Sequence, residues 1–200
     1  MNSDFLTAMI LLFVPIFSFL RIPKILSMHL NIEIKARSKR NADIRAILVE
    51  HGADFRGIDH QIDTYFNVDS GRMKLREGTI EHSLIYYERS DQAGPKSSKV
   101  HLYRPQADPA LKAVLSAALG VWKVIDKRRE IAFIDNVKFH LDMVEGLGEF
   151  MEIEAIDVDG SLGEAHIQQQ CRYYMTLLGI QAEDLLTNSY SDMVKESDVE

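Results

Sequence analysis

The sequence has little cysteine, little tryptophan and an excess of negative over positive charge. Its single cysteine, Cys171, leaves no disulfide possible within the chain and no cluster of thiolate metal ligands, so we expect Cys171 to be a buried packing residue in a protein of a reducing compartment, the cytoplasm. The formal net charge of -7 argues against sequence-independent binding to DNA or RNA, because such binding requires a basic surface that neutralises phosphates. The partner is therefore expected not to be a nucleic acid.

The chain also lacks internal repeats, low-complexity tracts and a second-domain linker, and its 46% hydrophobic and 26% charged residues are typical of one globular domain. The exception is an uncharged apolar run at residues 5–20. This run is shorter than the roughly 20 residues that a helix needs to span a bilayer, and Pro15 interrupts it. We interpret residues 1–28 as an extension of the reading frame upstream of a working start at Met28, with a membrane anchor as the second alternative and a cleaved leader as the third. Contact with a membrane is expected only through residues 5–20.

Charged and apolar side chains alternate along several segments. Residues 30–37 read LNIEIKAR, in which every second residue from Asn31 to Arg37 is polar and the residues between them are apolar. The same spacing recurs in RMKLR at 72–76, KFHLDM at 138–143 and FMEIEA at 150–155. Successive side chains of a strand point to opposite faces, so each segment predicts a strand with one charged face and one apolar face.

Turn and helix signals divide the chain into eight strands and three helices. Apolar residues at helical spacing predict the first helix, which ends at His51 and Gly52, and Asp108 with Pro109 begins the second. The expected strands are 30–37, 54–68, 72–77, 82–89, 99–104, 122–134, 137–144 and 149–158, and the expected helices are 41–50, 109–119 and 162–178. The last dozen residues, rich in Ser, Asp and Glu, are expected to form a mobile tail.

The charged faces of these strands permit two folds. In an open sheet, the apolar faces would pack against helices and the charged faces would lie in water. In a closed or nearly closed antiparallel barrel, the charged faces would meet inside, and the helices would cover part of the apolar exterior. We favour the barrel, an α+β fold, because one stripe recurs on four strands. Buried Lys and Arg side chains suit phosphate oxygens, and carboxylates beside them suit a hard divalent ion such as Mg²⁺ or Mn²⁺.

With these motifs, the chain from His29 to Gly179 resembles the CYTH family, named for class IV adenylyl cyclases and thiamine triphosphatases. The resemblance rests on NIEIKAR at 31–37, GRMKLRE at 71–77, LIYYER at 84–89, KRRE at 127–130 and HLDMVEGLGEFMEIE at 140–154. It implies an eight-stranded antiparallel tunnel, formed here by residues 29–180 and followed by an acidic tail at 181–200. In such a tunnel, basic side chains hold a triphosphate and carboxylates hold divalent metal, Mg²⁺ or Mn²⁺.

The resemblance also indicates the site residues, because Glu33 and Lys35 match the family's Glu-x-Glu-x-Lys signature. The expected substrate-binding residues are Lys35, Arg37, Lys74, Arg76, Arg89, Arg104, Lys127 and Arg129. Three of them, Lys35, Arg76 and Arg129, are also expected to act in catalysis. The expected metal ligands are Glu33, Asp142, Glu152 and Glu154. Asn31 departs from the family signature, since it stands where the family has its first Glu. Its amide oxygen can ligate a metal but brings no negative charge.

Three functions fit this pattern. Hydrolysis of a triphosphate such as ATP, thiamine triphosphate or tripolyphosphate is slightly favoured, because it requires recognition of the phosphates alone. Cyclisation of ATP to cyclic AMP and pyrophosphate is the alternative, and a non-catalytic phosphate-binding module is the third. His140 is expected to be either a base or a hydrogen-bonded structural residue. Tyr86, Tyr87 and Trp122 are expected to be packing residues rather than a platform for a base.

Overall fold

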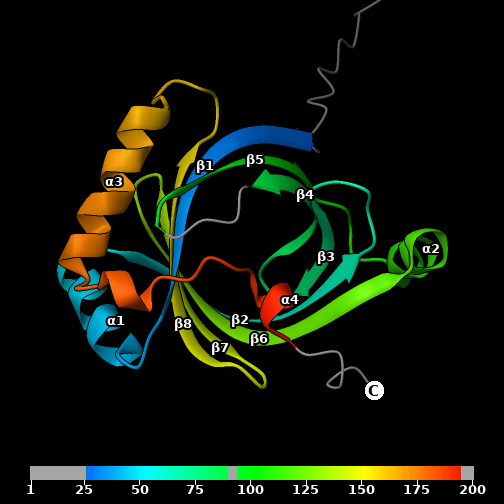
Figure 1. Cartoon of the computed structure of the whole chain (residues 1–200), viewed down its shortest axis with the longest axis horizontal. Coiled ribbons are helices and arrows are strands. Elements are labelled where there is room, and N and C mark those ends of the chain that lie inside the picture. The colour runs from blue at the N-terminus through cyan, green and yellow to red at the C-terminus, as the bar shows by residue number, and fades with distance from the viewer. Residues whose placement is uncertain (1–25, 90–93, 195–200) are drawn as a thin grey trace, which may run out of the picture.

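Eight antiparallel strands close into a barrel in the computed structural model, which describes residues 26–89 and 94–194, with side chains from His29 onward (Figure 1). The strands are β1 (Leu26–Arg37), β2 (Asp54–Phe66), β3 (Arg72–Gly78), β4 (His82–Arg89), β5 (Lys96–Tyr103), β6 (Val121–Ile134), β7 (Val137–Val144) and β8 (Gly148–Asp157). Their order is β1-β5-β4-β3-β2-β6-β7-β8, and pairing of β8 with β1 completes the ring. The predicted α+β fold with an eight-stranded tunnel is confirmed, and the open sheet is excluded.

The alternation in β1 separates the interior of the barrel from its exterior. Glu33 and Lys35 line the internal cavity, whereas Ile34 is fully buried in the core outside the sheet. The register with β8 places Glu154 opposite Glu33 and Glu152 opposite Lys35. Because side chains of directly paired residues project from the same face, the charged stripes of neighbouring strands meet inside the barrel.

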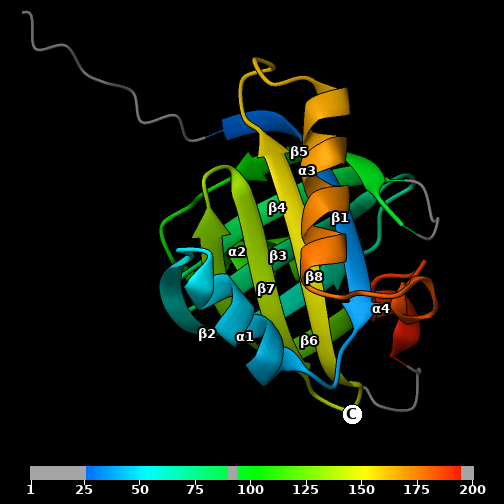
Figure 2. The same cartoon turned by 90° about the vertical axis from the view of Figure 1, so that its left-hand side faces the viewer.

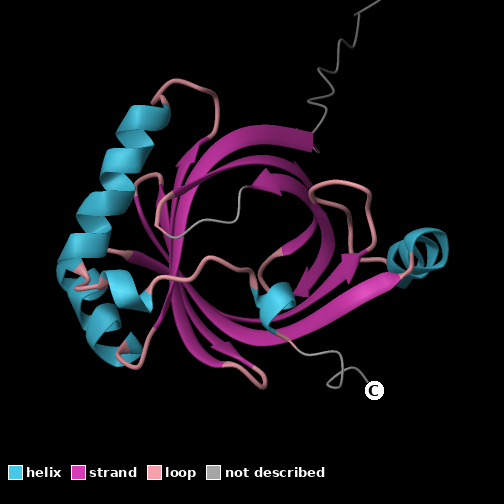
Figure 3. Ribbon diagram, in the orientation of Figure 1, coloured by secondary structure: helices cyan, strands magenta, loops and turns pink. Residues whose placement is uncertain are grey.

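Helices cover part of the exterior, as expected. The helices are α1 (Asn41–Glu50), α2 (Pro109–Leu119), α3 (Glu164–Leu177) and α4 (Tyr190–Met193), with a 3-10 turn at Ala182–Asp184. In Figures 1 and 2, α1 and α3 lie on one side of the barrel, and in Figure 3 both lie outside the ring of strands. They pack against β8, where Leu48 of α1 and Cys171 of α3 join Ile153 in one apolar core. The prediction that Cys171 is a buried packing residue is confirmed.

The C-terminal segment differs from the expected mobile tail as far as Val194. Its backbone joins the barrel, since Leu186 N donates to Lys35 O at 2.8 Å, and Lys96 Nζ donates to the carbonyl oxygens of Leu186 and Thr187 at 2.9 and 2.6 Å. It brings α4 to one mouth of the barrel (Figures 1 and 2), where Tyr190 is only 4% exposed. The polar composition concealed this segment because its attachment depends on tertiary contacts: backbone groups, the Tyr190 ring, and the Asp192 carboxylate, which accepts from Arg72 Nη2 at 3.0 and 2.9 Å.

The apolar run at 5–20 lies outside the described residues, and so do the hypotheses about it. Within the described part, β1 begins at Leu26, before Met28, because it pairs with the end of β5. None of the helices in that part is long and apolar enough to cross a membrane.

Candidate functional site

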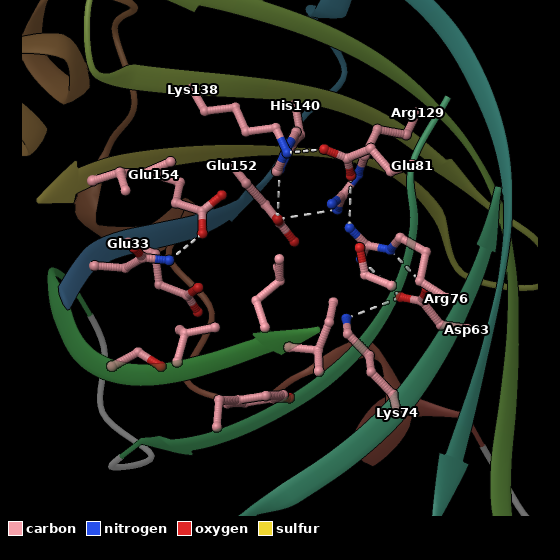
Figure 4. A pocket seen from close by; sticks show the side chains of 18 of the residues that line it. Glu33, Asp63, Lys74, Arg76, Glu81, Arg129, Lys138, His140, Glu152 and Glu154 are labelled. Atoms are coloured by element: carbon pink, nitrogen blue, oxygen red, sulfur yellow. Dashed lines mark hydrogen bonds and ion pairs between the residues drawn. The ribbon is translucent and has the colours of Figure 1, made fainter. Parts of the chain in front are cut away.

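The barrel encloses a cavity of about 630 Å³ that is lined by side chains from all eight strands. Most of the lining is ionisable: His29, Glu33, Lys35, Asp63, Lys74, Arg76, Glu81, His82, Arg89, Arg104, Lys127, Arg129, Lys138, His140, Glu152 and Glu154. Figure 4 shows the two sides of this cavity, with Glu33 and Glu154 on the left and Asp63, Lys74 and Arg76 on the right. The charged stripes of the sequence therefore converge on one enclosed space.

One side of the cavity is a basic wall, made of Lys74, Arg76 and Lys127 around the carboxylate of Asp63. Lys74 and Lys127 each donate from Nζ to Asp63 Oδ2, at 2.9 and 2.7 Å. Arg76 donates from Nε to Oδ1 at 2.8 Å and from Nη2 to Oδ2 at 2.9 Å. Three cations thus surround one carboxylate, and among the described residues only Arg76 has a second carboxylate in contact, Glu81 at 3.0 Å, so cations outnumber carboxylates in the basic wall.

The crowding of cations shows in the pKa values of this wall. Burial alone would raise the pKa of Asp63, but Arg76, Lys127 and Lys74 hold it well below its usual value. Lys127 is 1% exposed, and this burial lowers its pKa well below the usual range. The nearby cations Arg76, Arg129 and Lys74 lower the pKa of Lys127 further, whereas Asp63 raises it. An anion bound here would relieve the mutual repulsion of the cations.

Arg129 is held at the same end of the cavity by a fixed carboxylate. Its Nε and Nη2 donate to Asp142 Oδ1 and Oδ2 at 2.7 and 2.5 Å, and its Nη2 also donates to Glu152 Oε2 at 3.0 Å. Tyr190 donates its hydroxyl hydrogen to Asp142 Oδ2 at 2.7 Å. This fork-to-fork pairing fixes the plane of the Arg129 guanidinium, since both oxygens of Asp142 are engaged.

Across the cavity lies an acidic group, made of Glu33, Glu152 and Glu154 beside the amide of Asn31. Each carboxylate has a different neighbour: Arg89 donates to Glu33, Lys35 donates to Glu152, and Asn31 donates to Glu154. Among the described residues, no cation forms a salt bridge with Glu154. Burial raises the pKa of the Glu154 carboxyl, and the nearby carboxylates of Glu33 and Glu152 raise it further, against the effect of Lys138.

Several buried polar atoms of the cavity have no hydrogen-bond partner in the described part of the chain. They are Asn31 Oδ1, His82 Nε2, Arg89 Nε and Nη2, and His140 Nε2. Buried polar groups of folded proteins are nearly all hydrogen-bonded, because an unpaired one costs about 1 to 3 kcal/mol. One unpaired acceptor and two unpaired guanidinium donors in a charged cavity are consistent with a ligand that has both a cation and anionic oxygens.

The acidic group fits a hard divalent ion in its chemistry. No three His, Cys, Asp or Glu side chains come close enough together to hold a metal ion in the described ranges. However, the unpaired Asn31 Oδ1 lies beside the opposed carboxylates of Glu33 and Glu154. Mg²⁺ and Mn²⁺ prefer such oxygen donors and usually retain several waters, so a complete cage of protein ligands is not required.

The structure gathers most of the predicted residues but leaves two outside the lining. Arg37 is exposed at the end of β1, with its guanidinium 5.2 Å from the centroid of the Phe150 ring. Asp142 is fully buried behind Arg129 and is not part of the lining. Arg104 does line the cavity, at its exposed edge.

The aromatic residues and His140 occupy different positions. Tyr87 lines the cavity, whereas Tyr86 does not, and Trp122 packs edge-on against Tyr65 with ring centroids 6.2 Å apart. His140 Nδ1 lies 3.0 Å from Glu152 Oε2. Burial, with the nearby Arg129 and Lys138 cations, lowers the pKa of His140 to about 3, so the imidazole is neutral at pH 7.

Two acidic residues of the cavity were missed from the sequence. Asp63 follows the same two-residue spacing as the predicted stripes, in the DHQIDTY stretch of β2, so this periodicity could have identified it. Glu81 lies in the turn between β3 and β4, where it accepts hydrogen bonds from Arg76 and Lys138. No strand periodicity marks Glu81, because it lies outside the strands. The turn is held by Asp59, whose carboxylate accepts from the backbone N–H groups of Ile80 and Glu81 at 2.8 and 3.0 Å.

Comparisons with solved structures find proteins whose folds are similar to that of this chain. A protein from Pyrococcus horikoshii matches with a TM-score of 0.69 and 26% identity over 82% of this chain and 99% of that one. A candidate adenylate cyclase from Vibrio parahaemolyticus matches with a TM-score of 0.63 and 16% identity over 82% of this chain and 96% of that one. A candidate adenylyl cyclase from Hippeastrum matches with a TM-score of 0.51 and 11% identity over 86% of this chain and 94% of that one.

The last two similarities show a common fold alone. A comparison with curated proteins finds no match. The CYTH domain model, in contrast, matches residues 29–190, which is most of the sequence and includes β2 to β8, nearly all of β1 and the residues that line the cavity. The chain therefore belongs to the CYTH domain family.

Proposed function

We propose that this protein is a divalent-metal-dependent triphosphatase, which hydrolyses a phosphoanhydride bond of a triphosphate held in the tunnel. The observation that carries the proposal is the opposition of charge across the cavity. On one side, three cations surround the carboxylate of Asp63, and one of them, Arg76, also contacts Glu81. On the other, Glu154 lies beside Glu33 and forms no salt bridge with a cation in the described part of the chain, although Lys138 is its neighbour on β7. A triphosphate with its metal ion supplies the missing charge on both sides.

The basic wall supplies the contacts that phosphate oxygens require. Arg76 and Arg129 each donate from Nε and Nη2 to a carboxylate, so the planes of both guanidinium groups are fixed before a substrate arrives. Lys127 adds an amine that is 1% exposed, and a phosphate bound beside it would favour its protonated form. Cations that are fixed in a water-poor cavity stabilise charge that develops on phosphate oxygens, because little reorganisation accompanies the reaction.

The acidic group provides the place for the metal. Glu33 and Glu154 would hold Mg²⁺ or Mn²⁺ together with Asn31 Oδ1, and Glu152 lies next to them on β8. When bound, such an ion neutralises charge on the phosphates and on the oxygen that attacks or leaves. Asp142 takes the role of positioning Arg129 in this proposal, rather than that of a ligand.

Hydrolysis and cyclisation place different demands on the site. Hydrolysis requires the triphosphate, the metal and a water molecule, whereas cyclisation also requires the ribose hydroxyl to be aimed at the α-phosphorus. The Hippeastrum protein is named as a candidate adenylyl cyclase but is described as having a dominant triphosphatase activity. A protein of this fold can therefore be a triphosphatase even when it is named as a cyclase. We therefore place hydrolysis first and keep cyclisation of ATP as the alternative.

Product analysis tests the proposal. The full-length protein is incubated with ATP or tripolyphosphate and Mg²⁺ or Mn²⁺, and the products are separated by chromatography. Orthophosphate with ADP, or with diphosphate, indicates hydrolysis; cyclic AMP with pyrophosphate indicates cyclisation. Binding without turnover indicates a non-catalytic module.

A matched pair of variants connects any activity to the tunnel. Arg129→Ala removes a guanidinium that lines the cavity, whereas Arg128→Ala removes its exposed neighbour on the outer face of β6. We expect the first to abolish turnover and the second to leave it unchanged. Equal loss in both, or the absence of binding and turnover in the parent, would contradict the proposed function.

A further inference from the structure

Tyr190 lines the tunnel although it does not belong to a strand. It is the first residue of α4, at one mouth of the barrel (Figure 1), and is 4% exposed. Its ring packs on Phe150 of β8, with centroids 4.9 Å apart. An aromatic ring offers phosphate oxygens no charge, so the contacts of Tyr190 with its protein neighbours, rather than with a triphosphate, explain why it lies there.

The ring of Tyr190 holds the side chain of Lys35. Lys35 Nζ lies 3.4 Å from the centroid of the ring and donates to Glu152. Burial lowers the pKa of Lys35, and the carboxylates of Glu152 and Glu33 oppose this change, as would an anion in the cavity. The charged amine is attracted by the face of the ring, most strongly where water is excluded. The ring and Glu152 therefore fix the end of a lysine stem that is otherwise flexible.

The hydroxyl group of Tyr190 acts on Arg129 through Asp142. It donates to Asp142 Oδ2 at 2.7 Å, and the same oxygen accepts from Arg129 Nη2 at 2.5 Å. Burial, with the carboxylates of Asp142 and Glu152, raises the pKa of Tyr190 well above its usual value, so the hydroxyl remains a donor. A carboxylate held by a second donor keeps its orientation, so Tyr190 limits the rotation of Asp142 and thereby that of the Arg129 guanidinium.

The chain on both sides of Tyr190 is attached to the barrel. Before it, Leu186 N donates to Lys35 O at 2.8 Å. After it, the Asp192 carboxylate accepts from Arg72 Nη2 at 3.0 and 2.9 Å. The segment is thus tied to both β1 and β3, and the ring of Tyr190 reaches the cavity from a fixed support.

We propose that Tyr190 is a positioning residue of the reaction, which places Lys35 through its ring and Arg129 through its hydroxyl. This inference rests on the proposed function and adds a residue to its machinery. Lys35 and Arg129 contact the phosphates, and Tyr190 holds both cations where charge develops in the transition state. Fixed cations stabilise that charge better than mobile ones because they need no reorganisation, and a misplacement of about 1 Å can reduce turnover by about a hundredfold.

Steady-state kinetics of full-length variants tests this role, with Mg²⁺ and whichever triphosphate the parent turns over. Tyr190→Phe keeps the ring beside Lys35 and removes only the bond to Asp142, so kcat should fall by about three- to tenfold, as expected for one lost hydrogen bond. Tyr190→Leu removes both contacts and should lower kcat by about a hundredfold. In both variants KM should change by less than about twofold, because the interaction that is lost acts in the transition state.

Tyr174→Leu is the matched control. The ring of Tyr174 packs on Phe139 at the same centroid distance, 4.9 Å, but it lies on α3 and outside the cavity lining. We expect this variant to be less stable than the parent and to keep the parent's kcat and KM. Calorimetric titration with tripolyphosphate in EDTA should give one site per folded chain in every variant, which separates a slower enzyme from a partly unfolded one.

The possible results distinguish the inference from the proposed function. If Tyr190→Leu turns over as fast as the parent, or loses turnover only as much as Tyr174→Leu does, the inference is wrong while the proposed function stands. Loss of tripolyphosphate binding in Tyr190→Leu, or an equal fall of kcat in Tyr190→Phe and Tyr190→Leu, would also contradict it. If the parent turns over no triphosphate, the proposed function fails and the inference fails with it.

Discussion

Glu33 and Glu154 are directly opposed on the paired strands β1 and β8, and both enter the tunnel beside the buried amide of Asn31. Carboxylates on directly opposed residues of paired strands repel each other unless a cation or a proton lies between them. Arg89 donates to Glu33, but Glu154 receives only the Asn31 amide among the described residues. The pair therefore favours a bound cation, or a proton on Glu154, whose pKa is raised by burial and by the nearby carboxylates.

Removal of the Glu154 charge should weaken metal binding. Glu154→Gln keeps an oxygen that can accept from Asn31 but removes one negative charge, so the dissociation constant for Mn²⁺ should rise by at least about tenfold. Asn31→Asp should act in the opposite direction because it adds a charge. Electron paramagnetic resonance of free Mn²⁺ measures both effects without turnover. Glu149→Gln, on the outer face of β8, is the control, and equal Mn²⁺ affinity in all these proteins would refute the metal assignment.

Loss of Arg76 should weaken triphosphate binding and preserve the barrel. Arg76→Ala removes two hydrogen bonds to Asp63, but Lys74 and Lys127 still neutralise that carboxylate. The binding free energy for tripolyphosphate should fall by about 2 to 5 kcal/mol, the usual cost of deleting a buried charged contact. Calorimetry measures the affinity, and circular dichroism checks the fold. A collapsed fold would instead indicate that Arg76 is a structural ion-pair residue.

Asp63→Asn should destabilise the protein in a pH-dependent manner. At neutral pH it leaves Lys74, Arg76 and Lys127 buried without their common carboxylate, at a cost of about 3 to 5 kcal/mol in the free energy of unfolding. The pKa of Asp63 is depressed in the folded state, so its contribution is complete above the unfolded value of about 3.9 and is lost as the pH falls below that value. Urea denaturation should therefore show a parent-to-variant difference that is largest near neutrality and smaller below about pH 4. A difference independent of pH would contradict this role.

Two changes at Tyr190 should separate its hydroxyl from its ring. Tyr190→Phe removes the hydrogen bond to Asp142 and should lower the free energy of unfolding by about 0.5 to 1.5 kcal/mol. Tyr190→Ala also removes the ring that packs on Phe150, with centroids 4.9 Å apart, and should cost about 3 to 5 kcal/mol. Urea denaturation measures both. Equal stability of the alanine variant and the parent would show that the C-terminal segment does not anchor the barrel through this residue.

The sequence predicts the barrel well because alternation is a local property of each strand. Once the stripe at Asn31 to Arg37 recurs on β3, β7 and β8, closure of the sheet brings those stripes together. Local pattern does not indicate which charges face each other. The pairing of Arg129 with Asp142, which withdraws Asp142 from the cavity, depends on the register between β6 and β7.

Other features arise only from tertiary structure. Glu81 enters the cavity from a turn, and Tyr190 enters it from a segment that reads as a polar tail. The position of Val100 and Leu102 inside the barrel was absent from the prediction because such an apolar stripe can equally belong to an exterior core. That position follows from the pairing of β4 with β5 and from the closure of the ring.

The most direct test of the account is calorimetric titration of the full-length protein with tripolyphosphate and with orthophosphate, without metal. We predict saturable binding of one tripolyphosphate per chain, weaker binding of orthophosphate, and affinity that decreases as salt is added, because buried cations of the basic wall hold several phosphate groups at once. Absence of saturable binding, or equal affinity for the two anions, would show that the cations in the tunnel serve only to neutralise their carboxylate partners.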